Sequence, residues 1–145
     1  MWNATVLTLF PEMFPGTLDF SIAGKALKNG IWSLKNINIR DFSNDKNGKV
    51  DDIPFGGGHG MVIKPEVLNN ALKSVADEIG PRIYLSPRGR KFDQSFAKDL
   101  SKEKGVVFIC GRYEGVDERF LNHNEIQEVS VGDYVLSGGE IGAQL

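Results

Sequence analysis

The sequence predicts an α/β fold with a mainly parallel sheet and helices on both faces. Residues 106–110 form a continuous apolar, β-branched run, which is typical of a strand buried on both faces in a parallel sheet. Strand-like runs alternate with stretches of helical periodicity in the order βαβ, a long loop, then αβαβαβ. Connection rules favour an ordinary doubly wound sheet, because knots are nearly absent from proteins.

A βαβ unit is predicted near the N-terminus. Residues 6–10 read as an apolar strand that ends at Pro11. Apolar residues near helical spacing then predict a helix over 17–29, which an Asn-Gly pair would end. Apolar and polar residues alternate over 31–39, and this alternation predicts a second strand with one wetter face.

A second helix is predicted after the long loop. Pro65 suits the first turn of a helix, and a clear apolar stripe continues to Ile79. A Gly-Pro pair ends this stripe. Residues 83–85 read as a short strand that runs into a loop over 86–90.

The remaining elements surround the buried run. Asp93 is a predicted N-cap of a helix that continues to about Lys104, just before the strand at 106–110. A short helix is expected over 117–121, and a last strand over 125–131. Together these elements complete a single α/β domain, which the length of 145 residues allows.

Composition excludes several classes of protein. A net charge of −2 counts against a free-standing basic nucleic-acid binder, although it leaves room for a local basic patch at 82–91. One cysteine excludes an internal disulfide and a cysteine-only zinc site, and two isolated histidines have no metal-ligand spacing. The sequence shows neither a secretory leader pattern nor a membrane-length apolar run, so we expect a cytoplasmic protein without a membrane partner.

Two glycine-punctuated loops follow predicted strands. Residues 110–119 hold an arginine, a tyrosine and acids, and residues 131–140 hold three glycines. Such loops at the carboxyl ends of parallel strands are where α/β sheets bind ligands. A tight turn would explain either loop alone. The two together, with two more loops upstream, favour a ligand site.

The long loop over 40–60 is polar and ends in near-continuous glycine. A loop of this length in a compact domain is usually functional or disordered. A flexible linker is the alternative, but Phe55 and Met61 bracket the glycines with apolar anchors that a linker would not need. The loop is not a P-loop, and the chain has no Gly-x-Gly-x-x-Gly fingerprint.

Seven segments, in order and at matching intervals, resemble the bacterial tRNA (guanine-37-N1)-methyltransferases of the SPOUT class. They are residues 9–14, 40–42, 50–52, 55–61, 84–90, 110–119 and 132–140. The resemblance covers the whole chain. It implies a deep trefoil knot at the cofactor site, in place of an ordinary doubly wound sheet, and a homodimer with active sites at the subunit interface.

The resemblance also implies that S-adenosylmethionine is the cofactor, held bent by three loops. Glu114 would face the sulfonium and support catalysis, while Tyr113 and Leu136 could instead be core residues. The implied cofactor-binding residues are Tyr84, Leu85, Ser86, Pro87, Gly111, Tyr113, Glu114, Gly115, Val131, Gly132, Asp133, Tyr134, Val135, Leu136, Gly138 and Gly139.

The implied substrate is the guanine next to the anticodon of a tRNA. Arg88 and Arg112 could meet phosphates, although solvated surface arginine is the commoner state. Magnesium is linked to the family's activity, but no ligand cluster in the sequence locates a metal. His59 stands where the family usually has a small residue or proline, which we expect only to tune the loop. The residues that would cradle the guanine are Asp51, Gly57, Gly58, His59, Gly60 and Met61.

The chain ends at Leu145, where the family continues into its last knot helix, a linker and a helical tRNA-binding domain. The resemblance places the family's general base, an aspartate, and the arginine that steadies O6 beyond this point. We therefore expect residues 1–145 to be the N-terminal cofactor-binding domain and not to methylate tRNA alone. One alternative is a non-catalytic cofactor-binding or dimerisation module. Another is a Rossmann-type methyltransferase or nucleotide enzyme, which the missing glycine fingerprint disfavours.

Overall fold

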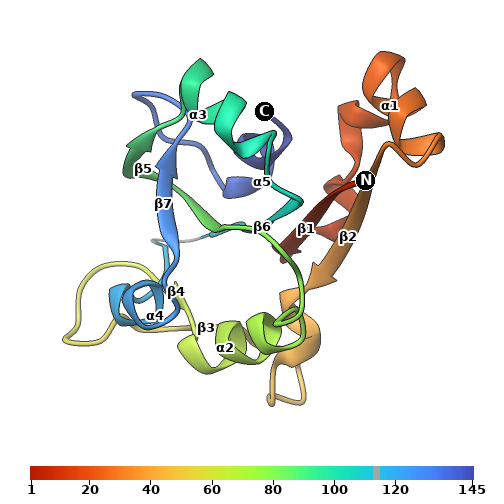
Figure 1. Cartoon of the computed structure of the whole chain (residues 1–145). Helices are drawn as coiled ribbons and strands as arrows, with labels where there is room; N and C mark the ends of the chain where they lie inside the picture. The colour runs from red at the N-terminus through yellow and green to blue at the C-terminus, as the bar shows by residue number, and fades with distance from the viewer. Residues whose placement is uncertain (113–114) are drawn as a thin grey trace.

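The computed structural model describes residues 1–112 and 115–145. Within them, a five-stranded sheet forms the centre, in the order β2-β1-β6-β5-β7, and every strand pair in it is parallel (Figure 1). A separate antiparallel pair, β3 with β4, lies outside this sheet. The strands are β1 Trp2–Thr8, β2 Trp32–Asn38, β3 Asp51–Asp52, β4 Val62–Ile63, β5 Arg82–Lys91, β6 Gly105–Ile109 and β7 Gln127–Ser130.

The α-helices alternate with the strands of the main sheet, as predicted. Short 3₁₀ turns extend the connections near the N-terminus. The α-helices are α1 Ser21–Lys28, α2 Pro65–Lys73, α3 Gln94–Leu100, α4 Glu118–His123 and α5 Gly139–Gln144. The 3₁₀ turns are η1 Pro11–Met13, η2 Gly16–Asp19 and η3 Ile39–Phe42. No helix among the described residues is long and apolar enough to cross a membrane.

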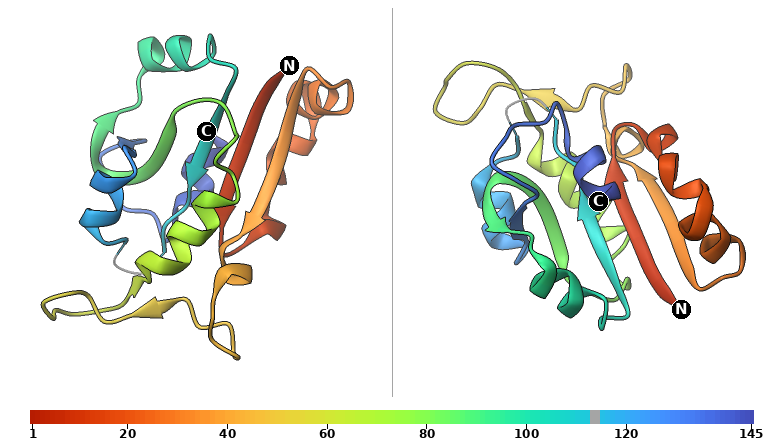
Figure 2. Two further views of the ribbon diagram at one scale, coloured as in Figure 1. Left: turned by 60° about the horizontal axis from the view of Figure 1, so that its bottom comes forward. Right: turned by 90° about the horizontal axis from the view of Figure 1, so that it is seen from above.

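Helices cover both faces of the sheet, which confirms the predicted fold class. On one face, Val107 and Ile109 of β6 share a core cluster with Leu68 of α2 and Phe120 of α4. On the other, Val106 belongs to a cluster with α3, and a neighbouring cluster includes a residue of α5. Figure 2 shows α2 and α5 on opposite sides of the strands. The alternation arises because successive side chains of a strand point to opposite faces.

The central position of β6 explains its composition. It pairs with β1 on one side and with β5 on the other. A strand with neighbours on both edges and helices on both faces meets almost no water, so it is apolar at nearly every position. Val106, Val107 and Ile109 are each at most 1% exposed, which confirms the predicted buried strand.

Several predicted boundaries were wrong. The first strand begins at Trp2 and ends before Phe10. The helix predicted over 17–29 is split into η2 and α1, and Gly24 allows the two to touch, because a Cβ there would lie 2.0 Å from the carbonyl oxygen of Asp19. Helix α2 ends at Lys73, where the hydroxyl of Ser74 donates to the carbonyl oxygen of Ala71 at 2.6 Å.

Strand β5 continues through the loop predicted at 86–90. It pairs with β7 up to Leu85 and again from Arg90, and the pairing register shifts between them. The residues between form an excursion, defined here as 86–89, that leaves the ladder and returns. Gly89 permits the return, because a Cβ there would lie 2.3 Å from the backbone of Glu128. This excursion forms one wall of the site described below.

Helix α5 and the β3–β4 pair are elements that the sequence did not predict. Helix α5 follows edge strand β7, yet it packs back toward the centre of the sheet. The amide of Gly139 donates to the carbonyl oxygen of Gly111 at 3.0 Å, and Gly142 lies close to Leu85 and Val131. The chain after β7 therefore returns across the ends of β5 and β6.

Candidate functional site

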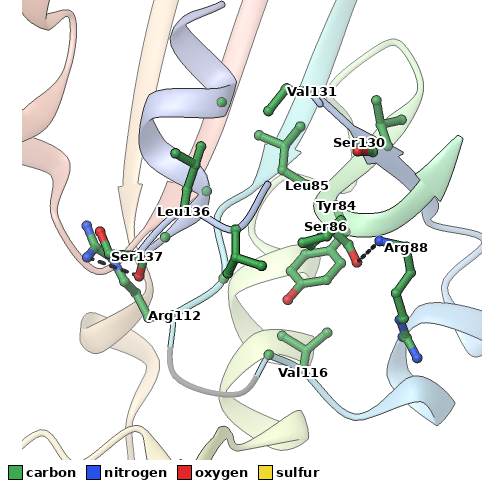
Figure 3. Close-up of a pocket in the computed structure, with 18 of the residues that line it drawn as sticks. Tyr84, Leu85, Ser86, Arg88, Arg112, Val116, Ser130, Val131, Leu136 and Ser137 are labelled. Atoms are coloured by element: carbon green, nitrogen blue, oxygen red, sulfur yellow. Dashed lines mark hydrogen bonds between the residues drawn. The ribbon is translucent and has the colours of Figure 1, made fainter. Parts of the chain in front are cut away.

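A cavity of about 530 Å³ opens beside the excursion of β5 and the carboxyl ends of β6 and β7. Pockets that hold small ligands typically measure about 300–1,000 Å³. Three separate segments line it, namely residues 84–88, residues 111–118 and residues 129–142, with Tyr113 and Glu114 outside the described residues (Figure 3). The topology thus assembles one cavity from parts that are far apart in the sequence.

Most residues predicted to bind the cofactor line this cavity. Those that do are Tyr84, Leu85, Ser86, Pro87, Gly111, Gly115, Val131, Gly132, Tyr134, Val135, Leu136, Gly138 and Gly139. The structure does not place Asp133 among the lining residues. Tyr113 and Glu114 were also predicted, but they lie outside the described residues.

Eight of the described residues that line the cavity were not predicted to bind the cofactor. Val129 and Ser130 are the last residues of β7, and Gly142 belongs to the unpredicted α5. The sequence did contain a signal for Val129 and Ser130. The last strand was predicted over 125–131, and the residues at the end of a parallel strand are expected to border a ligand site. The additional lining residues are Arg88, Arg112, Val116, Glu118, Val129, Ser130, Ser137 and Gly142.

Apolar side chains and local hydrogen bonds shape the walls. Leu85, Val131 and Leu136 bring aliphatic groups to the cavity, as Figure 3 shows. The hydroxyl of Ser130 donates to the carbonyl oxygen of Gly132 at 2.9 Å and also accepts from its amide at 3.3 Å. These bonds fix the turn at the start of the third segment. The arrangement suits a ligand with a flat apolar part and several polar edges.

Tyr84 and Gly111 meet at the inner end of the cavity. Tyr84 is only 7% exposed, and a Cβ on Gly111 would lie 2.5 Å from its hydroxyl oxygen. Burial raises the pKa of Tyr84 from 10.0 to about 12, and the negative charge of Glu128 adds to the rise. The phenol is therefore neutral near pH 7, and it offers a ligand a neutral hydroxyl group.

The titration of Tyr84 gives a testable pH dependence. The folded state holds the phenolic proton more tightly than the unfolded chain, so this contribution to stability is complete below pH 10 and is lost as the pH rises toward about 12. A shift of this size corresponds to about 2–3 kcal/mol. We expect urea unfolding to show a larger alkaline loss of stability for the unaltered chain than for Tyr84→Phe. Equal losses in the two proteins would contradict the assignment.

Two arginines line the cavity in different environments. Arg88 is exposed at the rim and pairs with Glu128 at 3.0 Å, and hydrogen bonding to that carboxylate raises the pKa of Arg88. An exposed pair of this kind contributes little stability, so Arg88 can exchange partners easily. Arg112 is mostly buried and lies 3.0 Å from a carboxylate oxygen of Glu140, which is fully buried.

The residues predicted to cradle guanine do not line the cavity. Asp51 lies in β3 and pairs with Ile63 of β4, and residues 57–61 belong to the loop between these two strands. The loop is nevertheless tied to the site at its base, because the amide of Ile63 donates to the carbonyl oxygen of Gly115 at 3.3 Å. Added Cβ atoms at Gly57 and Gly58 would meet nothing within 4 Å, so this part of the loop is open.

Phe55, which precedes the glycines of this loop, packs against Arg119 of helix α4. Phe55 is exposed, and the guanidinium of Arg119 lies 4.2 Å from its ring centroid. Arg119 also donates two side-chain hydrogen bonds to Asp117, which lower the pKa of that carboxyl group. Among the described residues, no group of three or more His, Cys, Asp or Glu side chains is arranged to hold a metal ion.

Comparison with known proteins identifies the family. The family model described as "tRNA (Guanine-1)-methyltransferase TrmD" matches residues 2–145. The chain is 54% identical over 142 residues to a tRNA (guanine-N(1)-)-methyltransferase of Bartonella tribocorum, covering 98% of this chain and 61% of that protein. It is 53% identical over 143 residues to the protein of the same name from Rhodospirillum rubrum, covering 99% and 60%.

A third relative of the same name, from Rickettsia akari, is 55% identical over 142 residues and covers 96% of this chain. The chain spans about 60% of the length of that protein as well. The family model, in contrast, matches almost the entire chain, including all three segments that line the cavity. This chain therefore belongs to the tRNA (guanine-1)-methyltransferase family.

Proposed function

We propose that residues 1–145 are the S-adenosylmethionine-binding domain of an enzyme that methylates N1 of guanine 37, next to the anticodon of tRNA. The observation that carries the proposal is the cavity built from three strand-end segments in a chain of this family. The names of the relatives specify tRNA and guanine N1. The identity of the methyl donor and position 37 go beyond what these names state.

The residues that line the cavity fit this cofactor. Leu85 and Leu136 offer aliphatic surface for an adenine ring, and Gly132, Gly138 and Gly139 leave backbone close to the cavity for its polar edges. The cofactor supplies a methyl group on a positively charged sulfonium. A carboxylate is favourable beside such a charge, which supports the proposed role of Glu114.

The chemical work of these residues is positioning. Methyl transfer needs the donor and the accepting nitrogen in line and close together, and correct orientation can supply much of the barrier reduction. Contacts from three separate segments would restrict the cofactor to few conformations. Neutral Tyr84 adds no competing charge at the inner end. None of these residues is proposed as the general base.

The guanine would be held by Asp51 and the glycine loop at residues 57–61. The open space around Gly57 and Gly58 lets backbone approach a flat base closely. The hydrogen bond between Ile63 and Gly115 couples the base of this loop to the cavity segment that contains Gly115. A guanine in the loop would thus lie beside the cofactor cavity.

Further parts of the proposal concern assembly and location. Val135, Ile141 and Leu145 are exposed apolar residues within or beyond the third segment, as expected of a surface covered by a second copy. We therefore propose a homodimer. Membership of the family supports two further proposals, a trefoil knot at the cavity and a helical tRNA-binding domain in the complete enzyme. A cytoplasmic location is proposed because tRNA is the substrate. A role for Mg²⁺ is proposed without a site.

Ligand titration and methyl transfer test the proposal. Calorimetry with the 145-residue chain should show one site for S-adenosylhomocysteine and no binding of NAD. The product of the complete reading frame should transfer labelled methyl groups to a tRNA transcript that carries guanine at position 37. It should fail with adenine at that position, because adenine lacks the O6 and the N1–H group by which guanine would be recognised. NAD binding without S-adenosylhomocysteine binding would instead support a nucleotide enzyme.

A further inference from the structure

We infer that Glu140 is a positioning residue of the cofactor cavity. Through Arg112, it holds the cavity wall around Ser137 in place. The inference rests on the proposed function, because it assumes that the cavity binds the methyl donor. It also gives a role to the segment at residues 9–14, which the proposed function leaves unexplained.

Glu140 is a buried acid with few partners. Its side chain is 0% exposed, and its Oε1 accepts a hydrogen bond from the hydroxyl of Thr8 at 2.8 Å. Its Oε2 lies 3.0 Å from Nη2 of Arg112. A carboxylate removed from water is costly unless it is paired and hydrogen-bonded. The position of Glu140 therefore depends on both Thr8 and Arg112.

Arg112 is held by several different segments. Its guanidinium lies 4.5 Å from the ring centroid of Phe10, and its Nη2 lies 3.5 Å from the sulfur of Met13. Its Nη1 donates to the carbonyl oxygen of Ser137 at 3.4 Å, and Figure 3 shows these two residues side by side at one edge of the cavity. Arg112 therefore joins η1 and the residue before it, through Met13 and Phe10, to the third lining segment.

The Arg112–Glu140 pair contributes more to the position of the neighbouring backbone than to the stability of the fold. Nε of Arg112 and Oε2 of Glu140 are buried without a hydrogen-bond partner among the described residues, so the 3.0 Å approach is an ion pair without hydrogen-bond geometry. A buried pair that leaves polar atoms unsatisfied gives little net stabilisation. Its retention needs another reason.

Gly138 supplies that reason. A Cβ at this position would lie 2.3 Å from Nε of Arg112 and 2.6 Å from Oε2 of Glu140, so the backbone of Gly138 rests directly on the pair. Ser137, Gly138 and Gly139 all line the cavity. The Arg112–Glu140 pair therefore supports this wall from behind, and loss of the carboxylate should loosen the wall.

A loosened wall should release the ligand faster. Substitutions that disturb an interface change dissociation rates more than association rates. Removing the support behind metal ligands typically costs about 10–100-fold in affinity, and we expect Glu140→Gln to weaken binding of S-adenosylhomocysteine by a similar factor. Gln keeps the size of the side chain and an oxygen for Thr8. It removes only the charge that attracts Arg112.

The experiment uses the 145-residue chain with S-adenosylhomocysteine. Calorimetry gives the affinity, surface plasmon resonance gives both rates, and urea unfolding gives stability. Arg112→Lys keeps the opposite charge, but one ammonium group cannot contact Ser137 and Glu140 as the guanidinium does, so it should weaken affinity by a factor similar to that of Glu140→Gln. The double variant should bind no more weakly than Glu140→Gln, because contacting residues that act as a unit are not additive. The control is Glu78→Gln, which breaks the exposed 2.7 Å pair with Lys35 and should leave affinity unchanged.

A purely structural role predicts a different result. Glu140→Gln would then lower the urea midpoint while the folded protein bound S-adenosylhomocysteine with unchanged affinity and dissociation rate, and that outcome overturns the inference. If the unaltered chain binds none of this ligand, the proposed function fails as well. Normal binding by the unaltered chain and by Glu140→Gln alike overturns this inference alone.

A second variant covers the case in which Glu140→Gln does not fold. Thr8→Val removes the hydroxyl that donates to Glu140 and accepts from the amide of Phe10 at 3.0 Å, and it leaves both groups of the ion pair in place. We expect it to weaken affinity in the same direction by about 3–10-fold, which is the equivalent of one hydrogen bond. Affinity equal to that of the unaltered chain would overturn the inference.

Discussion

Gly111→Ala should weaken the binding of S-adenosylhomocysteine by about 100-fold, since overpacking of this kind typically costs about 1–3 kcal/mol. A Cβ at position 111 would lie 2.5 Å from the hydroxyl oxygen of Tyr84 and 2.7 Å from its ring. Tyr84 is buried, so its ring has little room to withdraw except into the cavity. A ligand would then have to displace the ring. Calorimetric titration of the two proteins measures the effect.

A second substitution and a control separate this cause from general damage. Tyr84→Phe removes the atom nearest to the added methyl group, so Gly111→Ala/Tyr84→Phe should recover part of the lost affinity. Gly30→Ala is the control, because a Cβ there meets nothing within 4 Å and the residue does not line the cavity, so the strain of its positive φ should lower stability and leave ligand affinity unchanged. Tight binding by Gly111→Ala would show that the inner end of the cavity is not part of the ligand site.

Gly80→Ala should lower the free energy of unfolding by about 3 kcal/mol or more, because it combines backbone strain with a steric clash. Gly80 has a φ of +123°, which side chains rarely adopt. An added Cβ would also lie 1.9 Å from the carbonyl oxygen of Gly105, at the start of β6. The connection into β5 would have to move away from the central strand. Urea unfolding with an unchanged m-value measures the loss.

Gly30→Ala is the matched control for this change. Gly30 also has a positive φ, +68°, but an added Cβ meets nothing within 4 Å. Only the strain remains, and it should cost about 1–2 kcal/mol. The difference between the two variants isolates the close approach of residues 80 and 105. Equal losses would contradict a steric origin.

The local sequence pattern was sufficient to predict elements that depend on uniform burial or on neighbouring residues in the chain. The run at 106–110 is apolar at every position because its strand is buried on all sides, and such burial leaves a direct trace in the sequence. Asp93 was a correct N-cap because its side chain accepts from the amide of Phe96, three residues away, at 2.8 Å. Both features depend on neighbours along the chain or on hydrophobicity alone.

Much of the candidate site also followed from the sequence. Loops at the ends of parallel strands meet at one edge of a sheet, so the predicted strand ends brought Tyr84, Gly111 and Gly132 to one cavity. The resemblance to the family added the remaining predicted residues and the ligand that we propose. It could not indicate that Asp133 is not among the lining residues although Gly132 and Tyr134 are.

What the sequence determined by itself is the α/β class, the buried central strand and the loops that line the cavity of the candidate site. The tertiary structure alone decided the strand order, the return of α5 from the sheet edge and the burial of Glu140. Glu140 accepts its hydrogen bond from Thr8, which is 132 positions away. Contacts at such separation leave no periodicity in the chain, because they depend on which strands pair and not on the residues beside them. Glu140 follows a Ser-Gly-Gly sequence, and from the sequence alone it would be expected at the surface. Only the fold shows that it is buried beside Arg112.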